Sequence, residues 1–169
     1  MKLRNYKDTD ARHITNWVRD EQVYYQWCAG LFGDYPLTED KINRYYTVLQ
    51  KNKTYWALTA EDEQGVVGHI TMRFTDEEKK TLRLGFVLVD DTRRGQGLGK
   101  ELVTLAIDYA QQFLAPQSIT LGVFVNNDAA KRCYEAVGFK TDESHMETYQ
   151  VKDEVWDCIE MIYKQNDFP

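Results

Sequence analysis

Long apolar runs, cysteine and positive charge are all scarce in this sequence. No apolar stretch approaches the ~20 residues that a membrane-spanning helix needs, and residues 1–6 hold no run that could serve as a secretory signal. The 3 cysteines, Cys28, Cys133 and Cys158, are odd in number and follow no paired or metal-ligand spacing. We therefore expect reduced thiols in a cytoplasmic protein without a metal site.

The net charge of −6 argues against two classes of partner. Non-specific binding to nucleic acid or to an anionic membrane needs a positive surface, so neither is expected, whereas a cationic partner is permitted. With 43% apolar and 28% charged residues, the composition is that of an ordinary globular protein. Its 169 residues fit one domain, and we expect a single domain over 1–169.

Capping and hydrophobic patterns organise the first half of the chain. A helix capped by Asp8 or Thr9 is predicted to end near 20–21, and an irregular aromatic loop follows at 24–36. Thr38 caps a second helix. Strand patterns separated by short polar turns then predict an antiparallel meander at 55–59, 66–74 and 81–89. In the last of these strands, one face should hold Leu82, Leu84, Phe86 and Leu88.

The second half begins with an amphipathic helix, predicted from Leu98 until Pro116. A buried strand at 119–125 follows, and a strand, a helix and a strand in this order usually form a parallel crossover, so the sheet should be mixed. A further helix at 127–137 should stop at Gly138. Two closing strands are expected at 149–151 and 155–163. The second could pair across subunits if its edge is free, so we expect a monomer or a homodimer.

The segment from Arg93 to Lys100, Arg-Arg-Gly-Gln-Gly-Leu-Gly-Lys, carries the most specific chemistry. Its glycines let the backbone approach a ligand, and unpaired amides at the start of the following helix favour a phosphate. Two nucleotide-binding patterns fail here. Arg94 stands where a P-loop needs its first glycine. Counted from Gly95, Lys100 stands where a dinucleotide-binding loop needs its last glycine.

The run from Arg94 to Gly99 resembles the Gln/Arg-x-x-Gly-x-Gly/Ala signature of the GNAT superfamily of N-acetyltransferases. A second segment, Asn127 to Phe139, is similar to the Asn-x-x-Ala…Tyr-Glu-x-x-Gly-Phe motif of that family, at the expected distance. The resemblance implies an α/β (α+β) fold with a central mixed, mostly antiparallel twisted sheet of six to seven strands flanked by about four helices. It also implies an acyltransferase that moves an acetyl group from acetyl-CoA to a primary amine of a small molecule or protein.

The resemblance further implies a role for each matching residue. Backbone groups of Val87, Leu88 and Val89 would hold the pantetheine arm of acetyl-CoA, and Asn127 would contact the same arm. Tyr134 would protonate the departing thiolate, whose conjugate acid has a pKa near ~8.5. Core packing is the competing explanation for this tyrosine. The pyrophosphate would lie on a loop made of Arg94, Gly95, Gln96, Gly97, Leu98, Gly99 and Lys100.

A general base is not identified. Many relatives carry a glutamate on one of two central strands, but the corresponding positions here are Arg83 and Gly122. The aromatic segment from Tyr24 to Tyr35 is expected to shape the acceptor pocket, or else to cover one end of the core. Five other side chains are alternative general bases that would take the proton of the amine directly or through water: Glu21, His69, Asp90, His145 and Glu147.

Two other functions stay open as well. The missing carboxylate would suit a module that binds acyl-CoA with little turnover. In a purely structural domain, the glycines would merely turn the chain. Acceptors from a protein N-terminus or a lysine to a polyamine or an amino sugar are all compatible with the sequence.

Overall fold

The computed structural model describes residues 1–93 and 95–164. In that part of the chain, seven strands form one sheet in the order β1-β2-β3-β4-β5-β7-β6. Every neighbouring pair is antiparallel except β4 and β5, which run parallel. The strands are β1 (Lys2–Asn5), β2 (Tyr55–Asp62), β3 (Gly65–Phe74), β4 (Thr81–Val89), β5 (Ser118–Phe124), β6 (Lys140–Val151) and β7 (Glu154–Lys164).

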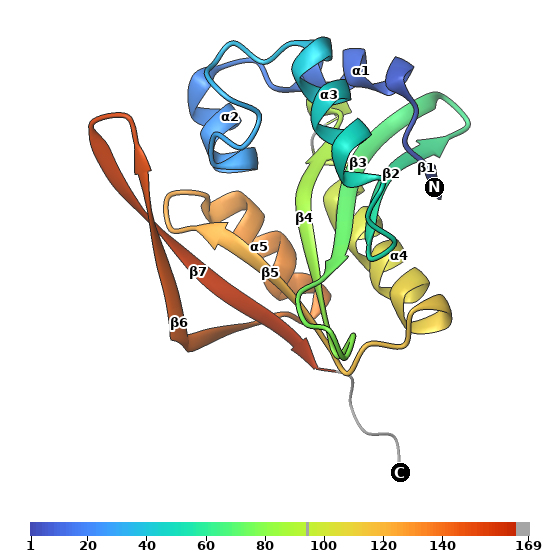
Figure 1. Ribbon diagram of the computed structural model, residues 1–169, viewed down its shortest axis with the longest axis vertical. Coiled ribbons are helices and arrows are strands. Elements are labelled where there is room, and N and C mark those ends of the chain that lie inside the picture. Colours follow the sequence, from blue (N-terminus) through green and yellow to red (C-terminus); the bar gives the residue numbers. More distant parts are fainter. Residues whose placement is uncertain (94, 165–169) are drawn as a thin grey trace.

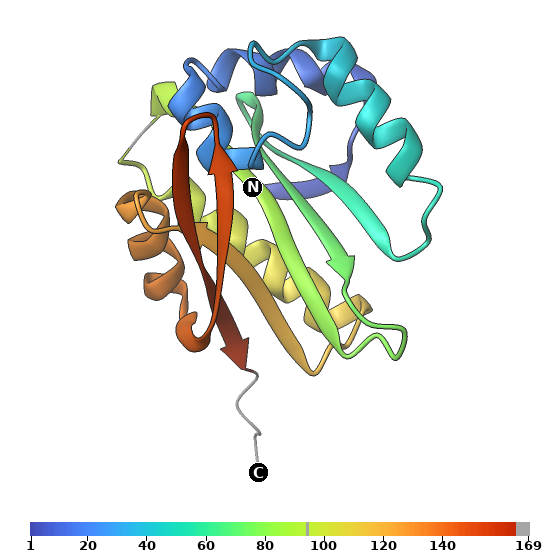
Figure 2. The ribbon, with the colours of Figure 1, turned by 60° about the vertical axis from the view of Figure 1, so that its left-hand side comes forward.

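Helices cover both faces of this sheet (Figures 1 and 2). One face packs against the first three helices, and the other packs against α4 and α5, so each face has its own apolar cluster. The helices are α1 (Ala11–Trp17), α2 (Glu21–Cys28), α3 (Glu39–Leu49), α4 (Leu98–Phe113) and α5 (Asp128–Val137), with short 3-10 turns at Asp8–Asp10 and Asp91–Arg93.

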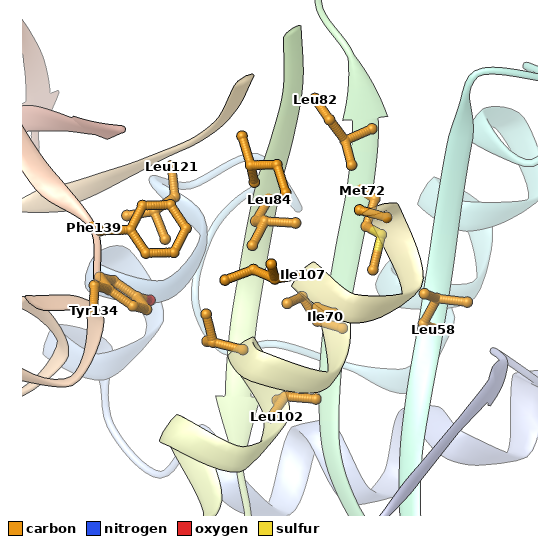
Figure 3. Close-up of a cluster of buried hydrophobic side chains, with 14 of the residues drawn as sticks. Leu58, Ile70, Met72, Leu82, Leu84, Leu102, Ile107, Leu121, Tyr134 and Phe139 are labelled. Atoms are coloured by element: carbon orange, nitrogen blue, oxygen red, sulfur yellow. The ribbon is translucent and has the colours of Figure 1, made fainter. Parts of the chain in front are cut away.

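A bulge in β4 exchanges the faces on which its side chains lie. Leu82 and Leu84 are buried in the cluster beneath α4 (Figure 3). Phe86 and Leu88 instead pack against the cluster of the first three helices. Phe86 has a φ of +48°, and the pairing with β3 slips at this point. Because side chains alternate along a strand, one inserted residue moves every later side chain to the opposite face. The prediction that these four residues share one face is therefore wrong.

Several predicted elements are confirmed. Thr38 begins α3, where its hydroxyl accepts a hydrogen bond from the amide of Lys41 at 3.3 Å. Gly138, with a φ of +116°, ends α5. The crossover from β4 through α4 to β5 is parallel. Seven strands agree with the predicted six to seven, and the five described helices exceed the predicted four by one.

The additional helix is α2, which occupies the start of the predicted aromatic loop. Asp20 caps it by accepting a hydrogen bond from the amide of Val23 at 2.8 Å, and Ala29 ends it with a φ of +52°. Only Tyr24 and Cys28 on this helix are buried, while its other aromatic side chains are half-exposed. Its apolar residues therefore form no continuous stripe, and periodicity does not indicate a helix.

The edges of the sheet also differ from the prediction. β7 lies between β5 and β6, so it is paired on both sides and offers no free edge to a second subunit. The short strand β1, which no sequence pattern indicated, pairs with β2 at the opposite edge.

Candidate functional site

Strands β4 and β5 pair only at their first residues and then separate. Their register runs from Thr81 opposite Ser118 to Arg83 opposite Thr120, and it does not continue beyond that pair. Figure 1 shows the two strands diverging from a common end. Backbone groups that face such a split have no strand partner, so they can form hydrogen bonds with an extended ligand.

A small cavity of about 120 Å³, the inner cavity, lies at this split. Four of the residues predicted from the resemblance line it together: Val87, Leu88, Asn127 and Tyr134. Val89 does not line it, but pairs with Gly68 on β3. The bulge at Phe86 lies beside the inner cavity and exposes this part of β4 to it.

Tyr134 reaches the inner cavity from α5. The helix begins after Asn127, whose side-chain oxygen accepts a hydrogen bond from the amide of Ala130 at 3.2 Å. Figure 3 shows the ring of Tyr134 beside Phe139, with their centroids 6.2 Å apart. Desolvation by burial raises the pKa of Tyr134, so its hydroxyl keeps a proton at neutral pH. The ring thus packs in the core and also borders the cavity.

The glycine-rich loop leads into α4 without a side-chain cap. Gly97, at the start of the helix, has a φ of +75°, and Gly95 has a φ of +78°. A β-carbon at either position would meet nothing within 4 Å, so it is the backbone conformation, and not crowding, that favours glycine. No described side chain caps α4, which leaves the amides of its first turn free to bind an anion.

The other residues of the predicted phosphate loop have distinct places. Gln96 and Lys100 are exposed, and Leu98, the first residue of α4, is buried. A β-carbon on Gly99 would lie 3.2 Å from the sulfur of Cys133, so this glycine lets α4 and α5 pack closely. Arg94 lies outside the described residues.

A second cavity of about 460 Å³, the outer cavity, adjoins the inner one. The two share residues 84–86 of β4, Gly122 of β5, and Gln26 and Trp27 of α2. Residues 26–29 of the aromatic segment line the outer cavity, whereas Tyr24 and Phe32 are buried in the cluster of the first three helices. Two spaces that meet at the split suit two substrates that react where the spaces join.

One of the two positions where the resemblance leads us to expect a glutamate, residue 83, carries an arginine in an ion pair instead. Arg83 on β4 donates a hydrogen bond from Nη1 to Oε2 of Glu160 on β7, at 2.5 Å. Both side chains are about four-fifths buried. Sequence reasoning did not identify Glu160, because it lies 77 residues from Arg83 and no local pattern connects them.

None of the five alternative bases lines either cavity. Within the described residues, no Asp, Glu or His borders the two spaces. His69 is buried and bonded to the hydroxyl of Tyr46 at 2.6 Å, and burial lowers its pKa to about 3. Each of the other four forms a side-chain hydrogen bond with a nearby residue: Glu21 with Lys152, Asp90 with Thr92, His145 with Asp142 and Glu147 with Tyr149.

The described residues hold no candidate for a metal site or a membrane-spanning helix. Among residues 1–93 and 95–164, no group of three or more His, Cys, Asp or Glu side chains could hold a metal ion. None of the helices in the same ranges is both long and apolar enough to cross a membrane.

Comparison with known proteins matches most of this chain to one family. The model of the acetyltransferase (GNAT) family matches residues 12–139. The N-alpha-acetyltransferase 30 of Saccharomyces cerevisiae is 32% identical over 104 residues, which cover 58% of this chain and 57% of that protein. The chain thus matches little more than half the length of this relative.

Solved structures share the fold at lower identity. The spermidine N-acetyltransferase of Vibrio cholerae, solved in complex with CoA and spermine, superposes with a TM-score of 0.80 at 21% identity, over 97% of this chain and 95% of that one. A chimera of that enzyme gives a TM-score of 0.77 at 20% identity, over 98% and 96%. At this level of identity the likeness establishes the fold.

Proposed function

Since the chain belongs to the acetyltransferase (GNAT) family, we propose that it transfers an acetyl group from acetyl-CoA to a primary amine of a small molecule or protein. One observation carries this proposal: Leu88 of β4 lines one cavity at the split between β4 and β5 together with Asn127, which caps α5, and Tyr134 within that helix. The larger cavity that adjoins it leaves room for the acceptor.

The binding of acetyl-CoA would use mostly main-chain groups. The uncapped first turn of α4, with Leu98, Gly99 and Lys100, offers amides to the pyrophosphate. Backbone groups of Val87 and Leu88, next to the bulge, would pair with the pantetheine arm. Val89 and Arg94 stay predictions from the family motif, the first because it does not line the inner cavity and the second because it lies outside the described residues.

Acetyl-CoA supplies the acetyl group as a thioester, and the amine attacks it directly. The role of Tyr134 would be to give its proton to the sulfur as the carbon–sulfur bond breaks. Burial raises the pKa of Tyr134. The same desolvation raises the pKa of a thiol formed in that cavity. The pKa of the proton donor and that of the proton acceptor therefore rise together.

The amine must also lose a proton, because an ammonium group has no lone pair for attack. No described Asp, Glu or His lines either cavity. We infer that the acceptor reacts from its neutral form, or that water carries the proton away from the outer cavity.

The test of the proposed function is acetyl transfer itself. The protein is incubated with acetyl-CoA and a panel of primary amines, and free thiol is followed together with the acetylated product. Thiol release that requires both the amine and the protein supports the proposal. Coenzyme binding without product for any amine would instead indicate an acyl-CoA-binding module.

We also propose a single domain over 1–169, a monomer or homodimer, and a cytoplasmic location. The three cysteines are unpaired in the described chain, which suits a reducing compartment. Sedimentation of the purified protein would distinguish the two oligomeric states.

A further inference from the structure

We propose that the outer cavity takes an acceptor in which the primary amine is joined, through a flat apolar body, to a carboxylate, and that Arg73 and Tyr55 bind the carboxylate. This inference rests on the proposed acetyl transfer and names the class of its acceptor. The supporting observations are the shape of the cavity, its charges and one buried hydroxyl group without a partner.

Seven of the twenty described residues that line the outer cavity are aromatic. Trp27 of α2 lies against Phe86 of β4, with their centroids 5.4 Å apart, and Tyr45 of α3 lies 5.8 Å from the same ring. Phe124 and Tyr149 close the other side, with centroids 5.4 Å apart. Such flat faces favour a flat apolar body between them, because rings gain most when they stack or meet edge to face.

The charged side chains on this wall are both positive. Among the described residues that line the outer cavity, Arg73 and Arg83 are the two arginines, and there is no Asp, Glu, His or Lys. The two arginines are directly opposite each other on β3 and β4. Like charges in directly opposed positions repel, so this arrangement favours an anion between or beside them.

Carboxylates do lie near the arginines, in a smaller hollow that opens beside the outer cavity. Glu160 is held by Arg83 at 2.5 Å, and Glu147 accepts the hydroxyl of Tyr149 at 2.7 Å. Arg73 has no ion-pair partner within residues 1–93 and 95–164. The positive charge of Arg73 is therefore the one that remains for a ligand.

Tyr55 adds a hydrogen-bond donor next to this charge. It is directly opposite Arg73 on β2, so the two side chains lie on the same face of the sheet and both line the cavity. Tyr55 is 8% exposed, and its hydroxyl has no hydrogen-bond partner in the described chain. The hydroxyl of Thr71 is close enough to influence it, but the geometry falls short of a hydrogen bond. A buried hydroxyl without a partner is costly, and a ligand carboxylate would satisfy it.

This wall is unsuited to a polyamine. Such an acceptor carries several ammonium groups, which need carboxylates or carbonyls around them and are repelled by the unpaired guanidinium group of Arg73. An amine that carries a carboxylate at its far end can instead bind Arg73 through that carboxylate. Its amino group then points to residues 84–86, where the outer and inner cavities meet.

The test compares para-aminomethylbenzoate with para-aminomethylbenzamide, which has the same size and amine but no negative charge, and with spermidine. Acetyl transfer is measured as kcat/KM. Acceptor binding is measured separately by calorimetry with coenzyme A present. We expect the benzoate to be preferred over the benzamide by about tenfold or more in both measurements, the scale of one charge-assisted hydrogen bond.

The variants R73Q and Y55F test the two residues, with R44Q on the exposed surface of α3 as the matched control. R73Q should remove the preference for the benzoate, Y55F should reduce it, and R44Q should retain it. Equal or better use of the benzamide or of spermidine by the wild type, or an unchanged preference in R73Q, would overturn the inference.

The two measurements also separate this inference from the proposed function. If the benzoate binds preferentially but no amine is acetylated, acetyl transfer is refuted and the ligand site stands. If amines are acetylated without any preference for the benzoate, the enzyme stands and the assignment of the acceptor is wrong.

Discussion

The guanidinium group of Arg83 on β4 occupies the space that a side chain at Gly122 on β5 would fill. A β-carbon on Gly122 would lie 2.6 Å from Nη2 of Arg83 and 3.0 Å from the sulfur of Cys158. The absence of a side chain at Gly122 therefore allows the guanidinium group to lie across β5 and reach Glu160. The two departures from the family pattern, at 83 and at 122, are thus parts of one arrangement.

The first prediction concerns this pair. Gly122→Ala forces Arg83 away and weakens its ion pair with Glu160, whereas in an Arg83→Ala background the added methyl group meets only Cys158. We expect the alanine to lower the free energy of unfolding by about 1 kcal/mol more in the wild type than in the Arg83→Ala protein. Urea unfolding of the four proteins measures this difference. Additive effects of the two substitutions would show that they do not share the space.

The second prediction concerns Tyr134. Replacing it with phenylalanine keeps the ring that packs against Phe139 and removes the proton donor. We expect kcat to fall by about 100-fold or more, with little change in the affinity for acetyl-CoA or in thermal stability. Tyr109→Phe is the matched control, because Tyr109 lies on α4 and lines neither cavity. If Tyr134→Phe turns over as fast as the control, the hydroxyl does not donate the proton.

The third prediction concerns the backbone at the start of α4. Gly97→Ala places a β-carbon on a residue with a φ of +75°, which strains the loop and displaces the amides that would hold the pyrophosphate. We expect a loss of about 1–2 kcal/mol in stability and a clear loss of affinity for coenzyme A.

Gly65→Ala is the control for strain alone. Gly65 has a φ of +114°, begins β3, and has as much free space for a β-carbon as Gly97. It should lose stability and keep its affinity for coenzyme A, measured by calorimetry. An equal loss of affinity in the two variants would place the phosphate elsewhere.

The fourth prediction follows from the buried imidazole of His69. Burial lowers its pKa to about 3, whereas the unfolded chain protonates it near ~6.5. Between these two values the unfolded state binds the additional proton, so stability must fall as the pH falls through this window, by up to about 1.4 kcal/mol per pH unit. His69→Gln, which does not titrate, should flatten the dependence of the free energy of unfolding on pH between 4 and 6.5. The same slope in both proteins would contradict the assignment.

Local patterns in the sequence predicted those parts of the molecule that local chemistry determines. The cap at Thr38, the glycine stop at Gly138 and the amphipathic stripe of α4 each depend on residues within a few positions of one another. Asn127 and Tyr134, which line the inner cavity, were named from the family motif, and their roles stay predictions.

The rest depended on contacts between distant segments. The outer cavity combines Trp27, Tyr55, Arg73 and Tyr149, which come from four different elements, so no spacing in the sequence relates them. The alternation of apolar residues continues unbroken through Phe86, so the strand pattern predicts a regular strand where the bulge lies. The bulge nevertheless reverses the faces of the remaining half of β4.

The most direct test of the central claim is a crystal structure of the protein with coenzyme A. The account predicts the pyrophosphate at the amides of residues 97–100, the pantetheine arm along residues 87–88, and the sulfur atom within hydrogen-bond distance of the Tyr134 hydroxyl. A coenzyme bound elsewhere, or a sulfur atom far from Tyr134, would contradict it.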